Sequence, residues 1–264
     1  MSRPATAAVI VIGNEILSGR TKDANLSYIA AKLGEAGIRV MEARVVPDVE
    51  AAIVEAVNTC RGRYGYVFTT GGIGPTHDDI TARCIAAAFG VPFGRNEEAE
   101  RRLRGYYDPD QVNEARLSMA DMPLGVELID NPVSIAPGFR LENVYVLPGV
   151  PKILQAMVDG LVGSLEGGTP IASRALTVYA PEGEMAAMLA GVQARFPTLD
   201  LGSYPFFRQG RFGTTLVCRG ADTLAVAQAH AALVEEATRM GVESAVFDAA
   251  TARDDALPPG PIRP

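Results

Sequence analysis

Short apolar runs alternate with segments of helical periodicity along the first part of the chain. Ala7–Ile12 is almost continuously apolar and ends at Gly13, a pattern typical of a strand buried on both faces of a parallel sheet. Apolar residues then recur at helical spacing behind Asp23, a candidate N-cap, and the periodicity stops at Gly37. The opening segment therefore predicts a strand followed by a helix.

The same alternation continues beyond this first pair. It predicts, in order, a strand at Ile38–Val46, a helix capped by Asp48, a strand at Tyr64–Thr70, a helix at Ile80–Phe89, a polar amphipathic helix at Asn96–Tyr107, an edge strand at Val126–Ile129, a strand at Asn143–Leu147 and a helix ending near Leu165. Strands separated by helices favour parallel pairing through right-handed crossovers. We expect an α/β domain with a mostly parallel sheet over residues 1–166.

A second module is expected after Glu166–Pro170, which has the composition of a linker. Its pattern predicts a strand at Ala175–Tyr179, a helix at Gly183–Phe196, strands at Leu199–Tyr204 and Gly213–Cys218, and a helix at Leu224–Met240. This order indicates a small α+β domain over residues 171–247. The proline-rich tail at 248–264 lacks apolar periodicity and is expected to be disordered.

Composition narrows the classes of partner. The net charge of -7 would repel a nucleic-acid backbone or an anionic membrane, and no basic run is present. Cys60, Cys84 and Cys218 have the spacing of neither a zinc site nor a disulfide framework. The apolar run near the N-terminus is too short for a membrane span and lacks a convincing cleavage site, so a cytoplasmic protein is expected.

Four unusual loops should meet at one edge of the predicted sheet, because ligands of open parallel sheets bind beyond the carboxyl ends of the strands. They are Gly13–Gly19, Val46–Asp48, Thr69–Asp79 and Pro148–Pro151. Neither a GxGxxG dinucleotide fingerprint nor a GxxxxGK[ST] phosphate loop occurs among them. The search for a site therefore begins with the composition of the individual loops.

The third loop, TTGGIGPTHDD, has the composition of an anion site. Gly71, Gly72 and Gly74 allow backbone amides to approach a phosphate closely, and Thr69, Thr70 and Thr76 add hydroxyl donors; this set is expected to bind phosphate. The helix that follows would also present its positive dipole end to the anion. The alternative is that the glycines only form a tight turn and that Asp79 caps the helix.

Acidic residues beside a phosphate site call for a cation. Asp79, with Asp78 or Glu15, would provide hard oxygen ligands for Mg²⁺. For Asp78 the alternative is simple helix capping, and for Glu15 it is a surface charge. His77 is a candidate for contacting phosphate or assisting proton transfer. Asp48 is expected to cap its helix and, because of its place at the same edge, to have a second role at the site.

Five spaced motifs resemble one known family, the competence/damage-inducible protein A (CinA) family: GNEILSG, KDANLSYIAAKL, TTGGIGPTHDDIT, NPVSIAPGF and LPGVP. The resemblance covers about Ala7 to Leu165 and implies a three-layer α/β/α domain similar to the MoaB/Mog molybdopterin-binding domain. Two departures stand out. The deamidase domain of longer CinA proteins is not expected in this chain, and Asp23-Ala24-Asn25 replaces an Asn-Thr-Asn stretch.

The resemblance and the four loops together define a candidate site. The ligand-binding candidates are Gly13, Glu15, Gly19, Asn25, Thr70, Gly71, Gly72, Gly74, Thr76, Pro148 and Gly149. The catalytic candidates are Asp79, Asp48 and His77, and the metal-ligand candidates are Asp79, Asp78 and Glu15.

The resemblance implies a homo-oligomer that acts on a nucleotide or a pterin. The first hypothesis is a nucleotide pyrophosphatase that cleaves ADP-ribose or FAD with Mg²⁺ or Co²⁺, and with K⁺ as a further cation. A second hypothesis is a module that binds molybdopterin or a nucleotide without turnover. A third is a molybdopterin adenylyltransferase of molybdenum cofactor biosynthesis.

Overall fold

The computed structural model describes residues 5–208 and 210–247, which divide into two compact units at Thr169/Pro170. The predicted tail at 248–264 lies outside the described residues. In unit 1 the elements are β1 (Ala5–Ile12), α1 (Asn14–Leu17), α2 (Asn25–Glu35), β2 (Ile38–Val46), α3 (Glu50–Arg61), β3 (Tyr66–Thr70), α4 (Thr81–Phe89), β4 (Phe93–Arg95), α5 (Glu97–Tyr106), α6 (Glu114–Leu117), β5 (Asp121–Pro123), β6 (Glu127–Ile129), β7 (Gly138–Leu141), β8 (Val144–Leu147) and α7 (Pro151–Val162).

The sheet of unit 1 has the order β2-β1-β3-β8-β7-β6 within the described residues. The first four strands are parallel, and β7 and β6 extend the sheet by antiparallel pairing. The expected α/β fold with a mostly parallel sheet is therefore confirmed. Strand β1 lies between two parallel neighbours, which explains why Ala7–Ile12 reads as an unbroken apolar run.

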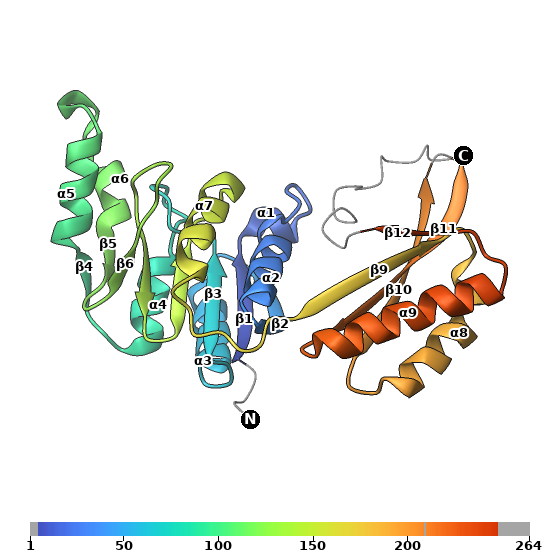
Figure 1. Ribbon diagram of the computed structural model, residues 1–264. Helices are drawn as coiled ribbons and strands as arrows, with labels where there is room; N and C mark the ends of the chain where they lie inside the picture. Colours follow the sequence, from blue (N-terminus) through green and yellow to red (C-terminus); the bar gives the residue numbers. More distant parts are fainter. Residues whose placement is uncertain (1–4, 209, 248–264) are drawn as a thin grey trace. The chain divides into compact units, whose positions relative to one another are not determined.

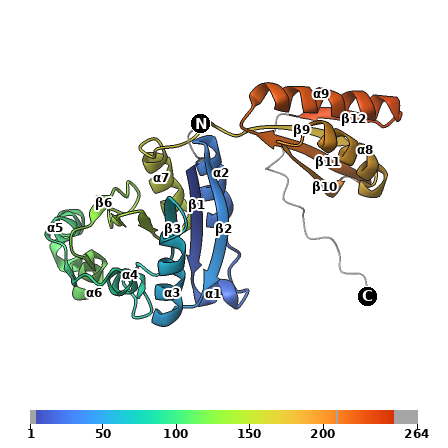
Figure 2. The same cartoon turned by 90° about the horizontal axis from the view of Figure 1, so that it is seen from below.

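Helices cover both faces of this sheet (Figures 1 and 2). α2 and α7 pack on the face that carries Val9 and Phe68, and α3 and α4 pack on the opposite face that carries Ile10. On α2, Ile29 and Leu33 are fully buried, as their helical spacing predicts. Each such side chain stabilises the fold by about 1.5–3 kcal/mol through burial.

Residues 91–137 leave the sheet and return to it. α5 and α6 lie beside the small two-stranded sheet of β4 and β5, beyond the β6 end of the main sheet (Figure 1). α5 begins behind Asn96, whose side chain accepts a hydrogen bond from the Ala99 amide, as is typical of an N-cap. Strands β4, β5 and β7 were not predicted. Each is three or four residues long, which is too short for an alternation of apolar and polar residues to be recognised.

Unit 2 contains β9 (Ala172–Val178), α8 (Glu182–Arg195), β10 (Asp200–Arg208), β11 (Arg211–Gly220), α9 (Thr223–Arg239) and β12 (Ser244–Phe247). Its sheet is antiparallel with the order β10-β11-β9-β12, and both helices contribute to one core with the sheet. β12 was not predicted, because its four residues directly precede the polar tail. His230 is 7% exposed and its Nε2 atom lies 3.2 Å from the Ala175 carbonyl oxygen, so it is a packed core residue.

The predicted linker Glu166–Pro170 is shorter than its composition indicates. The Glu166 carbonyl accepts a 3.0 Å hydrogen bond from the Tyr66 hydroxyl, and the Gly168 amide donates to the Gly37 carbonyl at 3.2 Å. A β-carbon on Gly167 would lie 1.8 Å from the Ala36 carbonyl oxygen, so this segment is pressed against the end of α2. Residues 166–168 are thus part of unit 1.

In the part of the chain that the structure describes, no helix combines the length and the apolar character needed to cross a bilayer.

Candidate functional site

The loops that follow β1, β3 and β8 meet at the carboxyl edge of the sheet. The Gly71 amide donates a 3.1 Å hydrogen bond to the Leu147 carbonyl, so the third loop is tied to the end of β8. A β-carbon on Gly71 would lie 2.2 Å from the Ile12 carbonyl oxygen, and one on Gly149 would lie 3.3 Å from the Gly71 α-carbon. These three loops therefore pack backbone against backbone.

Gly71 and Gly72 have structural reasons to be glycine that do not depend on a ligand. Their φ angles are +104° and +69°, which disfavour side chains. A β-carbon on Gly72 would also meet the Thr81 hydroxyl at 2.2 Å, while the Gly72 carbonyl accepts from the Thr81 amide at 2.9 Å. The turn therefore requires glycine at both positions, and phosphate binding by the loop stays a prediction.

Asn25 connects α2 to two of the loops. Its side-chain amide donates 2.8 Å hydrogen bonds to the Thr70 hydroxyl and to the Gly149 carbonyl, and Thr70 in turn bonds to the Pro148 carbonyl at 3.2 Å. Asn25 is 5% exposed, yet its Oδ1 atom has no hydrogen-bond partner among the described atoms. A buried amide oxygen normally has a donor, so this atom marks a place where an added donor would be favourable.

Two carboxylates bond to backbone amides in the segment that runs from β1 into α2. Ala24, and not Asp23, is the residue that precedes α2, but the Asp23 carboxylate accepts hydrogen bonds from the amides of Asn25 and Leu26 in the first turn of the helix. The Asp48 carboxylate accepts a 2.8 Å hydrogen bond from the Asn14 amide across 34 residues of sequence. The predicted capping of α3 by Asp48 is wrong, because α3 begins behind Val49 without a side-chain cap. Asp48 reaches the neighbouring loop instead.

Glu15 and the two flanking glycines complete that first loop. Glu15 folds back over Gly13, where a β-carbon would lie 2.5 Å from the carboxylate. Gly13 is itself buried, and Gly19 is exposed with a φ of +72° and open space around its α-carbon. The Glu15 carboxylate therefore depends on the missing side chain of Gly13 for its position.

Asp79 stabilises its own loop. Its carboxylate accepts hydrogen bonds from the backbone amide, at 2.8 Å, and from the hydroxyl of Thr76, and it lies beside Gly74, where a β-carbon would come within 2.7 Å of it. The alternative that Asp79 caps α4 is wrong, because the residue preceding α4 is Ile80 and no side chain caps the helix.

Asp78 and His77 lie at the outer rim of the loop. The His77 side chain is 98% exposed, with its Nδ1 atom 4.0 Å from the Asp78 carboxylate. The Thr76 side chain and, next, the Asp78 backbone lower the pKa of the Asp78 carboxyl below its usual value. The Asp78 side chain is exposed to solvent.

The acids do not form a ready-made metal centre. Within residues 5–208 and 210–247, no three His, Cys, Asp or Glu side chains gather as a potential metal site. Mg²⁺ in nucleotide sites commonly takes one or two carboxylates and completes its shell with water and substrate phosphates. The partly exposed carboxylates of Glu15, Asp48 and Asp79 are compatible with such a shared site.

A cavity of about 220 Å³ adjoins the third loop. Gly74, Thr76, His77 and Asp79 line it on one side, whereas Gly71 and Gly72 do not. The open space at the loop is thus on the side of its second half, and the first half is closed by packing.

The opposite wall of this cavity was not foreseen from the sequence. Arg83 contributes to it from α4, and the other residues come from the excursion and β7: Phe93, Ser118, Met119, Asp121, Met122, Pro137 and Phe139. The motif NPVSIAPGF contained the available signal. Asn131 folds that segment through four side-chain hydrogen bonds, to Val133, Ser134 and Ala136, and thereby directs the chain into β7.

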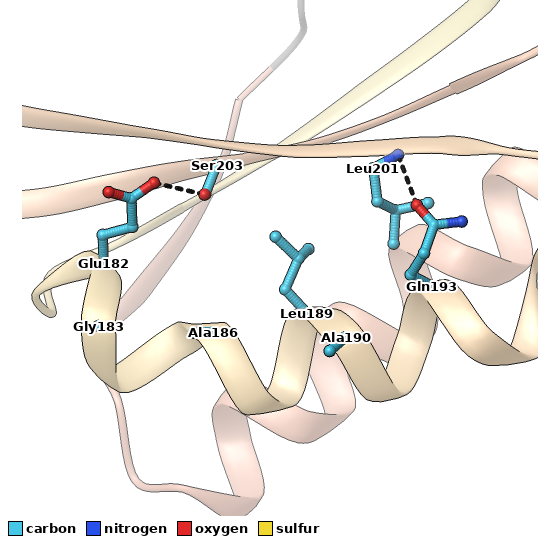
Figure 3. A pocket seen from close by; sticks show the side chains of 8 residues that line it. All are labelled: Glu182, Gly183, Ala186, Leu189, Ala190, Gln193, Leu201 and Ser203. Carbon is cyan, nitrogen blue, oxygen red and sulfur yellow. Dashed lines mark hydrogen bonds between the residues drawn. The ribbon is translucent and has the colours of Figure 1, made fainter.

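A larger cavity, of about 490 Å³, lies in unit 2 between α8 and β10 (Figure 3). Its polar groups are already bonded within the unit. Glu182 accepts a hydrogen bond from the Ser203 hydroxyl, and Gln193 accepts one from the Leu201 amide at 3.1 Å. The loops with unusual chemistry are in unit 1, so the smaller cavity is the better candidate for a ligand site.

Comparison with known proteins agrees with the two units. The family model described as "Probable molybdopterin binding domain" matches residues 8–167, and the model described as "FAD synthase, middle domain" matches residues 170–246. A crystal structure of the protein CinA from Thermoplasma acidophilum is 34% identical with a TM-score of 0.58, covering 62% of this chain and 99% of that one.

Two similar sequences contain parts of both units. A CinA-like protein from Syntrophus aciditrophicus is 37% identical over 221 residues, which cover 79% of this chain and 53% of the relative. A probable FAD synthase from Caenorhabditis briggsae is 33% identical over 240 residues, which cover 80% of this chain and 45% of the relative. The aligned region is thus about half the length of these two relatives. With its first unit matched along almost its whole length, the chain belongs to the family of CinA-like proteins with a MoaB/Mog-type probable molybdopterin-binding domain.

Proposed function

We propose that this protein binds a nucleotide diphosphate of the ADP-ribose or FAD type at the Thr69–Asp79 loop and hydrolyses its diphosphate with a divalent cation. The observation that carries the proposal is the cavity beside the second half of this loop, where Gly74, Thr76 and Asp79 are open to a ligand. The loop presents small and polar groups to phosphate oxygens there.

Charge is the second support for this proposal. Arg83, at the exposed side of α4, lines the same cavity as Asp79 and would attract a phosphate. Asp79 and Glu15 would repel one unless a cation lay between them, which is the role we assign to a divalent metal. When bound, such a cation would polarise the phosphoryl group and lower the pKa of water.

The residues have separate tasks in this proposal. Thr76 fixes one oxygen of Asp79 through its amide and hydroxyl, so that the carboxylate keeps one orientation toward the cavity side of the loop. Asp48 holds the first loop through the Asn14 amide, which keeps Glu15 at the same edge. His77, at the rim, would contact phosphate from the solvent side.

The choice of an FAD-type or ADP-ribose-type ligand draws on the similarity of both units to FAD synthase sequences. A protein whose two units resemble parts of a probable FAD synthase is well suited to bind a dinucleotide. This likeness supports the class of ligand and leaves the reaction to experiment.

A second function is favoured by one observation. The first unit matches a family model described as "Probable molybdopterin binding domain", which suits a module that binds molybdopterin or a nucleotide without turnover. Adenylyl transfer to molybdopterin is the third alternative, and it requires a nucleotide and a pterin side by side.

The test is to incubate the purified chain with ADP-ribose, FAD and ATP, with and without Mg²⁺ or Co²⁺, and to follow AMP release by chromatography. We expect metal-dependent AMP release from ADP-ribose or FAD. Asp79→Asn should lower the rate at least tenfold while calorimetry still detects ligand binding. Asp110→Asn, at an exposed acid outside the site, is the matched control and should keep the wild-type rate.

Three outcomes decide between the functions. Binding of a diphosphate without turnover in any metal would contradict hydrolysis and favour the binding module. Formation of an adenylylated pterin from ATP and molybdopterin would favour the transferase. Wild-type turnover by Asp79→Asn would remove Asp79 from the reaction.

A further inference from the structure

Strand β2 is an edge strand of the unit 1 sheet, and its outer side has no partner. It stands at one end of the sheet order and pairs with β1 alone among the described residues (Figure 2). The Gly13 amide donates to the Val46 carbonyl at 3.1 Å, so Val46 directs its backbone groups toward β1, as Arg44 does by strand alternation. The amides and carbonyls of Ala43 and Val45 therefore point away from the sheet.

An open edge strand invites pairing with another chain unless a protecting feature prevents it. β2 extends over nine residues, Ile38–Val46, which is long for a strand, and it contains neither proline nor lysine. A bulge at Met41 interrupts its register with β1, but from Glu42 to Val46 the pairing is regular. This regular stretch is thus a template for a further strand.

One face of this stretch is apolar and only partly covered. Ala43 and Val45 pair with Val9 and Val11, and they share the face on which α2 packs. Val45 is nevertheless 44% exposed, and Leu17 of α1, which lies beside β2, is 52% exposed. An apolar strip therefore extends along the edge beyond the cover of α2.

The opposite face of the stretch carries one acid and one base. The Glu42 carboxylate accepts a 2.7 Å hydrogen bond from the Arg44 Nε atom and another of 2.7 Å from the Tyr64 hydroxyl. Arg44 also bonds to Glu55 of α3 at 3.0 Å. Because Glu42 and Arg44 are both partly exposed, a strand added at this edge would meet one charge of each sign.

The order of side chains along β2 is symmetric about Ala43. Glu42 precedes it and Arg44 follows it, and the apolar residues Met41 and Val45 lie beyond them. In an antiparallel pair of two β2 strands centred on Ala43, each Glu42 faces an Arg44, and each Met41 faces a Val45. Opposite charges that face each other stabilise such a pair, whereas like charges destabilise it.

The backbone fits the same centre. Two Ala43 residues facing each other exchange both N–H···O bonds in a hydrogen-bonded antiparallel pair, which requires their backbone groups to point outward, as they do in β2. A centre shifted by one residue, to Glu42, would place two Glu42 side chains opposite each other.

We propose that β2 pairs with β2 of a second copy of this chain, antiparallel and centred on Ala43, so that the two main sheets become one continuous sheet. The charge complementarity of the strand with itself favours a second copy over an unrelated strand. The inference is independent of the proposed function, because β2 contributes nothing to the cavity beside the third loop.

Sedimentation velocity of the full chain over a concentration series tests the pairing. Wild type should form a dimer. Val45→Lys places a charge on the apolar strip, so it should raise the dissociation constant of the dimer by roughly tenfold or more. Leu124→Lys, at a similarly exposed apolar residue in the turn between β5 and β6, is the matched control and should associate as wild type does.

Two charge variants test the register. Glu42→Arg gives the strand two bases and Arg44→Glu gives it two acids, so each variant alone brings like charges together and should remain a monomer. An equimolar mixture of the two should form a heterodimer, which native mass spectrometry resolves from the homodimers. Both variants have lost the bonds between Glu42 and Arg44 of one chain, so the mixture isolates the contact between chains.

Three results would overturn the inference. Wild type that stays a monomer throughout the concentration series would exclude pairing through β2. A dimer whose dissociation constant is unchanged in Val45→Lys and in both charge variants would place the interface elsewhere. Charge variants that are folded by circular dichroism and yet do not associate when mixed would contradict the register centred on Ala43.

Discussion

The side-chain amide of Asn25 donates a 2.8 Å hydrogen bond to the Thr70 hydroxyl, joining the start of α2 to the end of β3 across 45 residues of sequence. The same amide nitrogen donates to the Gly149 carbonyl, also at 2.8 Å. One buried side chain thus links the beginning of a helix to the loops after β3 and β8, which is where the proposed ligand would bind.

Removal of this link should destabilise unit 1. Asn25→Ala deletes both hydrogen bonds and leaves the Gly149 carbonyl without its side-chain donor, so we expect a loss of about 1–3 kcal/mol in the free energy of unfolding. Urea denaturation followed by circular dichroism measures it. Asn58→Ala, at an exposed position of α3, should stay within about 0.5 kcal/mol of wild type. Equal losses in the two variants would show that the network does not contribute.

Gly71 and Gly19 allow close packing to be separated from backbone conformation. Both have positive φ angles, but a β-carbon on Gly71 would meet the Ile12 carbonyl at 2.2 Å, whereas one on Gly19 would have open space. We expect Gly19→Ala to cost about 1 kcal/mol from its backbone conformation. Gly71→Ala should cost about 3 kcal/mol or more, because the loop must also move. Thermal unfolding of both variants checks the order, and similar costs would argue against the close packing of the loops.

Asp48 makes a prediction about local rather than global stability. Asp48→Ala removes the acceptor of the Asn14 amide, so hydrogen exchange at that amide should become faster. The first turn of α3 should exchange at the wild-type rate, because no side chain caps that helix. Hydrogen exchange measured by NMR distinguishes the two segments. Faster exchange in α3 together with an unchanged Asn14 would restore the role of Asp48 as a helix cap.

Glu42 on β2 should contribute to the acid sensitivity of unit 1. A hydrogen bond from the Tyr64 hydroxyl, and next the contact with Arg44, lower its pKa below the ordinary value of 4.5. A carboxyl whose folded-state pKa is lowered stabilises the fold above its unfolded-state pKa, and that contribution disappears as the pH falls through the folded-state value. Stability should therefore begin to decline as the pH drops below about 4.5.

The measurement for Glu42 compares urea midpoints at pH 7 and pH 3. Glu42→Gln should show a smaller drop between the two pH values than wild type does, since it has no proton to gain. Glu97→Gln, at an exposed glutamate of α5, is the control and should follow the wild type. A drop in Glu42→Gln as large as that of wild type would contradict the assignment.

The sequence predicted well the helices and strands whose buried apolar residues follow a recognisable pattern along the chain. β2 extends over Ile38–Val46 as predicted, and β1 and α2 also lie where their apolar positions indicated. β3 begins two residues later than predicted, at Tyr66, because Tyr64 turns its hydroxyl to Glu42 instead of pairing in the sheet. Strands of three residues, such as β4 and β5, are defined by their pairing partner and leave no pattern of their own.

The site shows the same division between local and tertiary information. The loops were recognisable, because glycines, threonines and acids follow buried strands there. The partner of Asp48 was not, because its hydrogen bond crosses from one βα loop to the next and depends on the pairing of β1 with β2. The cavity wall at Phe93 and Asp121 was missed for a similar reason: these residues reach the loop only when the excursion folds back against α4.

Because residues 166–168 are anchored to the end of α2, the linker between the two units is short. Pro170 and Ile171 alone separate Thr169 from the first residue of β9. Two extended residues span roughly 7 Å. Only the backbone dihedrals of these two residues lie between the units, and the ring of Pro170 fixes one of them.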